Sequence, residues 1–214
     1  TASTRYTQGL VSDEQVWGND ICQIYIWNMT TVEFRVRVGG VENVISATNQ
    51  AILNTWNNLK LWRINNNVYI SLNSEVSNTT FSNGVNFTAN NTNIGRTEVI
   101  QPFFGYMSNF KMFVGTSEIP ETYNDKNVLD LDFKPTRKSY LFKDNNNKCI
   151  IHPVNITQRD YQDSKYCCSF NGTDQYLELG KNDLFNFGLD DFVLYFKIGI
   201  DDINSNFNKD NTII

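Results

Sequence analysis

The chain has 214 residues, of which 40% are hydrophobic and 14% aromatic, and a formal net charge of −5 at pH 7. This composition can fill one buried core, because all-β domains of roughly 200 residues commonly fold as single units. The acidic balance disfavours nucleic-acid binding, since proteins that bind phosphate backbones are usually basic. No stretch approaches the ~20 apolar residues of a membrane-spanning helix.

The N-terminal part of the chain predicts short antiparallel strands over residues 8–12, 21–27, 31–38 and 41–46. The third of these has the clearest pattern, because Val and Phe alternate with Thr, Glu and Arg along it. Two glycines at 39–40 then supply a tight hairpin turn, since glycine adopts positive φ without steric cost.

Residues 55–73 predict the β-hairpin around which the other strands are arranged. Alternate residues of its first strand share one face: Leu59, Leu61 and Arg63. The other face carries Lys60, Trp62 and Ile64. Three asparagines at 65–67 indicate the reversal, because Asn tolerates the left-handed backbone of a tight turn. A lone hairpin is marginal in water, so its apolar face is expected to pack on a second sheet.

After the hairpin, one or two strands are expected within residues 76–87, followed by a polar loop over 89–93. Residues 103–114 predict a long central strand, because they are apolar on both faces. Residues 118–126 contain Pro120 and show no periodic pattern, so they are the best linker candidate.

The remaining residues predict further short strands and one strong one. The short strands are expected over residues 128–133, 139–143, 149–153, 164–170 and 175–179. A turn at 171–174 and a helical turn at 183–187 are also expected, and the strong strand covers 191–200. No stretch sustains a 3.6-residue period over three turns, so the fold class is all-β with little helix.

The cysteines do not indicate a metal site. No Cys-x-x-Cys occurs and His152 is the only histidine, so a zinc site is disfavoured. Cys167 and Cys168 are adjacent on an expected strand and point to opposite faces, which makes them poor partners for each other. Buried free thiols are expected, and a bridge from Cys149 to Cys167 or Cys168 is the alternative.

Three segments carry motifs that occur together in one family. Residues 165–200, KYCCSFNGTDQYLELGKNDLFNFGLDDFVLYFKIGI, join an F-N-G-T turn to a long strand. Residues 52–73, ILNTWNNLKLWRINNNVYISLN, form a hairpin that begins with a Trp. Residues 102–115, PFFGYMSNFKMFVG, follow an F-x-G-Y pattern. Together they resemble concanavalin A-like, laminin-G-type domains, which implies an antiparallel jelly-roll β-sandwich.

The order of these motifs is reversed relative to the family, in which the F-N-G-T segment comes first. Residues 1–119 resemble the C-terminal half of a jelly roll, and residues 120–214 resemble the N-terminal half. Two interpretations stay open: one circularly permuted domain, or halves of two tandem domains within a longer chain. The chain starts at Thr1 rather than at Met and ends at Ile214 within an apolar pattern, which favours a piece of a longer chain.

The resemblance also indicates which catalytic groups an enzyme of this kind would have. Hydrolases of this superfamily place two carboxylates on one face of a strand, and a retaining pair needs its carboxyl groups ~5 Å apart. Asp130 and Asp132 have that spacing but alternate with leucines, so they are expected to face solvent. We therefore expect no enzyme activity.

Calcium is the family's commonest ligand and is held by oxygen atoms of loop residues. The residues nearest the matching loops are Asp174, Asp183, Asp190 and Asp191, with ordinary turn residues as the alternative. A sugar site would need exposed aromatic side chains beside Asn or Asp. The candidates by residue type are Trp17, Trp27, Trp62 and Tyr106, with core packing as the alternative.

The expected function is that of a non-enzymatic structural or adhesion module on a virion surface, such as a phage tail, fibre or head-decoration protein. Such a module packs against copies of itself or other virion proteins and binds host glycans. The 31 asparagines suit an AT-rich phage genome. The alternative is a secreted, lectin-like, carbohydrate-binding protein of a cell surface. Its glycans would be attached at six N-x-S/T sequons: Asn28, Asn78, Asn86, Asn90, Asn155 and Asn171.

Overall fold

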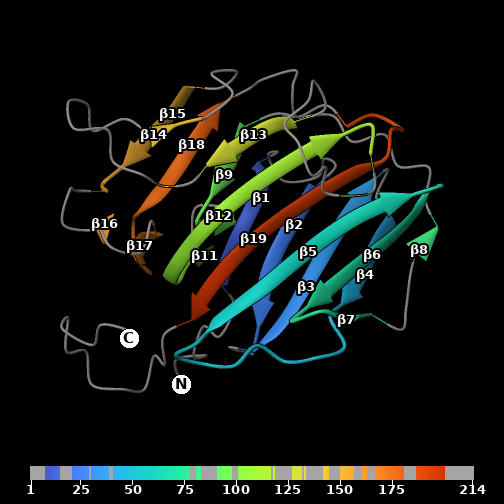
Figure 1. Cartoon of the computed structure of the whole chain (residues 1–214), viewed down its shortest axis with the longest axis horizontal. Helices are drawn as coiled ribbons and strands as arrows, with labels where there is room; N and C mark the ends of the chain where they lie inside the picture. Colours follow the sequence, from blue (N-terminus) through green and yellow to red (C-terminus); the bar gives the residue numbers. More distant parts are fainter. Residues whose placement is uncertain are drawn as a thin grey trace.

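The computed structural model describes most of the chain and is all-β (Figure 1). The described residues are 8–14, 21–28, 30–38, 41–77, 81–82, 91–97, 101–116, 118, 127–131, 133, 142–144, 150–156, 161–162, 167–180 and 187–200. None of them lies in a helix, which confirms the expected all-β character for this part of the chain. Accordingly, no helix among them is long and apolar enough to cross a membrane.

The first sheet, sheet A, is antiparallel throughout and has the order β14-β15-β18-β9-β1-β2-β3-β4. Its strands are β14 (Phe142–Lys143), β15 (Ile150–Val154), β18 (Tyr176–Gly180), β9 (Asn91–Ile94), β1 (Gln8–Glu14), β2 (Ile21–Trp27), β3 (Thr31–Val38) and β4 (Val41–Ser46). The strands predicted at 21–27, 31–38 and 41–46 coincide with β2, β3 and β4.

The second sheet, sheet B, has the order β16-β17-β12-β19-β5-β6-β7, with β13 on β12 and β8 on β6. Its strands are β16 (Tyr161–Gln162), β17 (Cys167–Asn171), β12 (Phe104–Val114), β13 (Asn127–Leu131), β19 (Phe192–Ile200), β5 (Trp56–Ile64), β6 (Asn67–Leu72), β7 (Glu75–Val76) and β8 (Phe81–Ser82). A separate pair joins β10 (Arg96–Thr97) to β11 (Gln101–Pro102).

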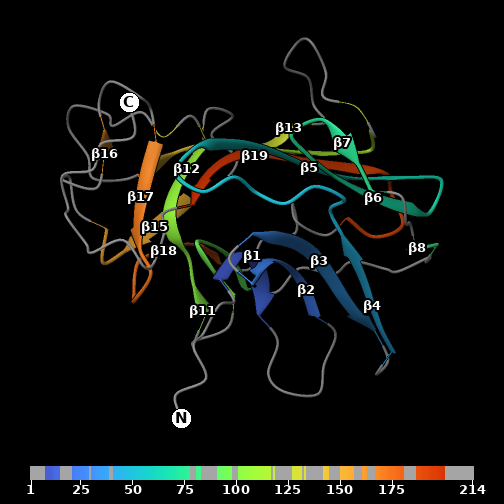
Figure 2. The ribbon, with the colours of Figure 1, turned by 90° about the horizontal axis from the view of Figure 1, so that it is seen from below.

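The two sheets lie face to face and enclose one apolar core, in a sandwich-like arrangement (Figure 2). In β3 the alternation places Val32, Phe34 and Val36 inside. In β19 the inner face is Phe192, Leu194, Phe196, Ile198 and Ile200, all buried as expected. Phe34 and Phe192 are each only 1% exposed, so the apolar sides of the predicted strands do meet.

Both sheets combine strands from the N-terminal and C-terminal segments. In sheet B, β19 lies between β12 and β5, and in sheet A, β18 lies between β15 and β9. Strands of residues 1–119 and 120–214 therefore complete one another within one core. The assignment of these segments to the two halves of a jelly roll stays a prediction.

The predicted hairpin at 55–73 is confirmed, with a two-residue turn. Asn65 and Asn66 adopt φ of 50° and 66°, so the turn uses the left-handed backbone that Asn tolerates. Asn67 already belongs to β6 and pairs with Ile64. Leu59, Leu61 and Arg63 are all buried, so the predicted face assignment of β5 is also confirmed.

The polar loop predicted at 89–93 is wrong for its described residues, because Asn91–Ile94 forms β9 in the interior of sheet A. The strand pairs with β1 on one side and β18 on the other. Thr92 and Asn93 are buried there, and Ile94 joins the core. Asn is disfavoured in strands, but pairing on both sides overrides that local preference.

Two other expectations cannot be compared with the structure. The linker expected at 118–126 has only Glu118 among the described residues. The helical turn expected at 183–187 has only Phe187 among them.

Candidate functional site

The outer face of sheet B, turned away from the core, carries a band of aromatic side chains. In β5 the even-numbered residues point outward, because the odd-numbered ones from 57 to 63 are buried. Cross-strand register extends this face to β6, β19 and β12. The outward residues that form the band are Trp56, Asn58, Lys60, Trp62, Tyr69, Tyr106 and Tyr195, which we call the aromatic strip.

One end of the aromatic strip is a stacked pair with a cation over it. Trp62 and Tyr69 lie opposite each other in the hairpin, with ring centroids 5.3 Å apart and planes at 14°. The Lys60 Nζ atom lies 4.7 Å from the Trp62 ring centroid. Partial burial lowers the pKa of Lys60, and Glu118 counteracts this.

The other end of the aromatic strip depends on a glycine. Tyr106 and Trp56 lie on β12 and β5, and both pair in register with Gly199 of the intervening strand β19. Because Gly199 has no side chain, the two rings meet above it, with centroids 6.5 Å apart at 63°. Such an edge-to-face contact is a favourable geometry for two aromatic rings.

Polar groups lie between the two aromatic ends. The Tyr195 hydroxyl donates to Asn58 Oδ1 at 3.2 Å. Burial raises the pKa of Tyr195 above its ordinary value. Trp56 and Trp62 are six positions apart on one strand, which separates them by about 20 Å at roughly 3.3 Å per residue.

The aromatic strip combines two of the four candidates for sugar binding. Trp62 and Tyr106 both lie on it and are half-buried rather than enclosed in the core. Trp27 is instead 48% exposed on sheet A, and Trp17 lies outside the described residues. Sequence reasoning missed Trp56, Tyr69 and Tyr195, because the register that aligns them with Trp62 and Tyr106 was not known.

The described calcium candidates serve as turn residues in this structure. Asp174 follows β17, where its carboxylate accepts hydrogen bonds from the side chains of Asn171 at 2.8 Å and Asn155 at 3.0 Å. Asp191 Oδ1 accepts from the Asn65 backbone N–H at 3.1 Å.

The backbone carbonyl of Asp190 accepts a hydrogen bond from Arg63. Asp183 lies outside the described residues. Within the described ranges, no three His, Cys, Asp or Glu side chains gather in a way that could hold a metal ion. The calcium assignment stays a prediction.

The expectation that Asp130 faces solvent is wrong. Asp130 points away from the core, as its alternation with the buried Leu129 and Leu131 requires, but it is only 1% exposed. Its Oδ2 lies 4.0 Å from Lys111 Nζ on the neighbouring strand. Its backbone N–H donates to Asp144 Oδ1 at 3.0 Å, and Asp144 is buried too. The outer face of sheet B is therefore covered at β13. Asp132 lies outside the described residues.

Cys167 and Cys168 are both buried, as expected, and neither forms a disulfide. The alternative that one of them forms a disulfide with Cys149 is therefore contradicted. Their positions follow from the strand alternation, because Cys168 joins the core cluster whereas its neighbour points to the opposite face of β17.

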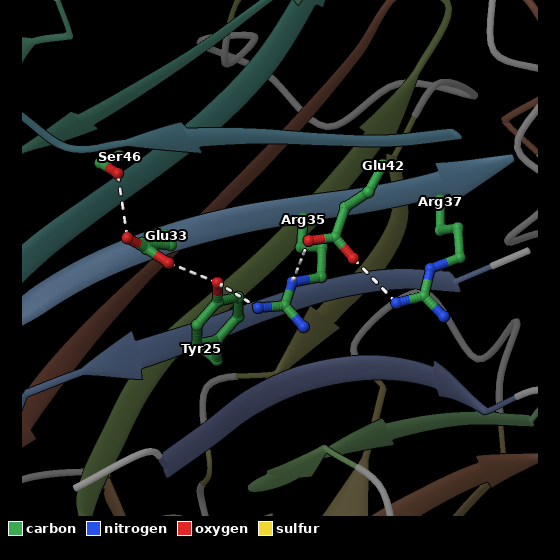
Figure 3. Close-up of polar contacts among 6 residues, drawn as sticks. All are labelled: Tyr25, Glu33, Arg35, Arg37, Glu42 and Ser46. Atoms are coloured by element: carbon green, nitrogen blue, oxygen red, sulfur yellow. Dashed lines mark hydrogen bonds and ion pairs between the residues drawn. The ribbon is translucent and has the colours of Figure 1, made fainter. Parts of the chain in front are cut away.

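The outer face of sheet A carries a polar network rather than an aromatic strip (Figure 3). The buried Tyr25 donates a short hydrogen bond to Glu33 Oε2 and accepts one from Arg35 Nη2 at 2.9 Å. Glu33 Oε1 accepts from the Ser46 hydroxyl at 3.1 Å. The network therefore links β2, β3 and β4 through side chains as well as through the backbone.

Tyr25 is expected to make stability depend on pH in the alkaline range. Burial, and next the hydrogen bond to Glu33, raise the pKa of Tyr25 from 10.0 to about 12. The folded chain then holds this proton more tightly than the unfolded chain does. The stabilisation is complete below about pH 10 and disappears between about pH 10 and 12.

Urea unfolding of the wild type and of Tyr25→Phe over this pH range measures the effect. As the pH rises, the free energy of unfolding of the wild type should fall relative to that of the variant. A difference in free energy of unfolding that is independent of pH would show that Tyr25 ionises at its ordinary pKa.

Comparisons of this chain with family models, curated proteins and solved structures gave no match. The chemistry of its surfaces is therefore the basis for assigning a function.

Proposed function

We propose that the chain is a non-enzymatic adhesion module that binds a glycan along the aromatic strip. The observation that carries this proposal is the placement of Trp56, Trp62, Tyr69, Tyr106 and Tyr195 on one outer face of a sheet. Buried aromatic rings are ordinary in a core, but these side chains are half-buried and lie on the side of the sheet away from the core.

The chemistry of the aromatic strip suits sugars. A pyranose ring has C–H groups on its faces and hydroxyl groups at its edges. Trp and Tyr side chains present apolar ring faces together with polar atoms, and they lose little conformational entropy when they bind. Asn58, Lys60 and Tyr195 supply hydrogen-bonding groups between the aromatic ends. The separation of about 20 Å between Trp56 and Trp62 favours an extended oligosaccharide over a single sugar.

The proposed setting is a virion surface, and the proposed fold is a concanavalin A-like jelly roll. The motif resemblance and the Asn-rich composition support this setting. In it the module packs against copies of itself or other virion proteins and contacts host glycans. A secreted, lectin-like cell-surface protein is the alternative setting for the same binding surface.

Glycan-array binding followed by calorimetry on the best oligosaccharide tests the proposal. Trp62→Ala is expected to weaken binding at least about tenfold, which corresponds to about 1.4 kcal/mol. Trp27→Ala is the matched control, because Trp27 is exposed on the other sheet, and it should bind like the wild type. Equal affinities for all three proteins, or no binding to any glycan, would overturn the proposal.

Mass spectrometry distinguishes the two settings. Detection of the chain in purified virus particles supports the virion. Glycans attached to the chain support the secreted alternative, and Asn28 is the sequon to examine first, because it is exposed at the turn between β2 and β3. Asn171 is also exposed, but its Nδ2 atom, to which a glycan would be attached, donates a hydrogen bond to Asp174 Oδ1 at 2.8 Å.

A further inference from the structure

The strand β4 is the longest border strand among the described ranges, and its pairing is regular. Among the described strands it pairs with β3 alone and lies at the border of sheet A (Figure 2). It has six residues, whereas the border strands β14, β16, β7 and β8 have two each and β13, which pairs with β12 alone, has five. Natural sheets blunt their edges with short strands, prolines, bulges or charged side chains, above all lysines. The sequence of β4, VENVIS, has one charged residue, Glu42, but no proline or lysine, and its register with β3 is unbroken.

The backbone groups on the free side of β4 follow from its pairing with β3. The Ala47 N–H donates to the Val32 carbonyl at 2.9 Å, so this residue directs its backbone groups toward β3. In an antiparallel ladder the direction alternates with each residue. Residues 43 and 45 therefore also face β3, whereas Glu42, Val44 and Ser46 direct their N–H and C=O groups outward.

We propose that two copies of this chain pair through β4, antiparallel to each other, about a two-fold axis at Val44. This register places Val44 opposite Val44 and Glu42 opposite Ser46. All three outward-facing residues of each copy then take part, and each of the three pairs exchanges two backbone hydrogen bonds. The two sheets A become one continuous sheet, and the contact is self-complementary, as a two-fold interface requires.

Side chains favour this register over one centred on Glu42. Val44 is 43% exposed in one copy, and the two-fold axis buries it against its counterpart. Glu42 faces a serine and keeps its pairing with Arg37, whose Nη2 donates to Glu42 Oε2 at 2.8 Å (Figure 3). A register centred on Glu42 would instead set two carboxylates opposite each other, which is destabilising.

The pairing rests in part on the proposed function, because it names one way in which the module packs against copies of itself. Its test is separate, since β4 belongs to sheet A and the aromatic strip to sheet B. Loss of glycan binding would not affect self-association through β4, and a monomer could still bind glycans.

Analytical ultracentrifugation of the whole chain over about a hundredfold range of concentration tests the proposal. The wild type should show a monomer–dimer equilibrium. Val44→Lys should weaken dimerisation at least about tenfold, because it sets two ammonium groups opposite each other on the axis. Ile52→Lys is the matched control: Ile52 is 60% exposed in a loop, and its replacement should leave the dimer unchanged. A wild type that stays monomeric, or equal dimerisation of all three proteins, overturns the proposal.

Cysteine cross-linking tests the register itself. Residues of a hydrogen-bonded antiparallel pair have Cα atoms about 5.5 Å apart, which is within disulfide range. Val44→Cys should therefore form a covalent dimer on mild oxidation. Glu42→Cys should not cross-link to itself, because the two copies of this position are four residues out of register, but it should cross-link to Ser46→Cys when the two variants are mixed. Equal cross-linking of Glu42→Cys alone and Val44→Cys alone contradicts the register.

Discussion

Replacing Arg63 with alanine is expected to lower the free energy of unfolding by about 3–5 kcal/mol. Arg63 is fully buried, although it belongs to the face of β5 that packs on the core. Its Nε donates to the Asp190 carbonyl at 3.0 Å, and its Nη2 donates to the Gly188 carbonyl at 2.8 Å. The guanidinium carbon lies 5.3 Å from the centroid of the Phe192 ring.

The loss has two physical sources. Alanine leaves a cavity where a large side chain was enclosed, and it leaves the Gly188 and Asp190 carbonyls without these donors. These carbonyls belong to the segment that leads into β19, so Arg63 also fixes the start of the central strand. A buried acceptor left unsatisfied costs about 1–3 kcal/mol, and the carbonyls of the partly buried Gly188 and the exposed Asp190 lie at the low end of this range.

Urea unfolding of Arg63→Ala measures this effect, and two variants control it. Arg63→Lys keeps a cation but cannot reproduce the two-carbonyl geometry, so an intermediate loss is expected. Arg37→Ala removes an arginine whose side chain is 35% exposed and ion-paired at the surface, which should cost about 1 kcal/mol or less. Equal losses for Arg63→Ala and Arg37→Ala would show that Arg63 does not organise the β19 start.

Gly105→Ala is expected to destabilise the chain by at least about 3 kcal/mol, because there is no room for a Cβ atom. Gly105 lies in β12 between Phe170 of β17 and Ile200 of β19. An added Cβ atom would lie 2.1 Å from the Gly199 carbonyl oxygen, which belongs to the backbone of the adjacent strand. The φ of 142° is also one that side-chain-bearing residues rarely adopt.

Gly115→Ala is the matched control for Gly105→Ala. Gly115 also has positive φ, at 75°, but nothing lies within 4 Å of its added Cβ atom. Gly115→Ala should therefore lower the free energy of unfolding by only about 1–2 kcal/mol, which is the cost of a side-chain-bearing residue at positive φ. Thermal and urea unfolding of both variants give the comparison. If Gly105→Ala unfolds no more readily than Gly115→Ala, β12 and β19 do not approach as closely as described.

The alternation of apolar and polar residues is the most informative signal in the sequence. It predicted which faces of β3, β5 and β19 are buried, because a two-residue period maps directly onto the two sides of a strand. It failed for β9, where Asn91, Thr92 and Asn93 have no apolar alternation and are held in the sheet by neighbours distant in sequence. Local pattern cannot reveal a strand that tertiary pairing imposes.

The candidate site was only partly predictable for the same reason. Trp62 and Tyr106 were candidates by residue type, but their common face depends on the register of β12, β19 and β5. The alternation of Asp130 with leucines predicts that it faces solvent, but alternation cannot distinguish an open outer face from a covered one. The meeting of Trp56 and Tyr106 above Gly199 likewise depends on pairing between distant strands.

Binding of glycan to the aromatic strip is tested most directly by NMR of the tryptophan indole N–H groups. The chain has four tryptophans, so it gives four signals, which Trp→Phe variants assign. Titration with the best oligosaccharide from the array should shift the signals of Trp56 and Trp62 and leave that of Trp27 unchanged. A shift of the Trp27 signal with those of Trp56 and Trp62 unmoved would contradict the assignment of the binding surface to sheet B.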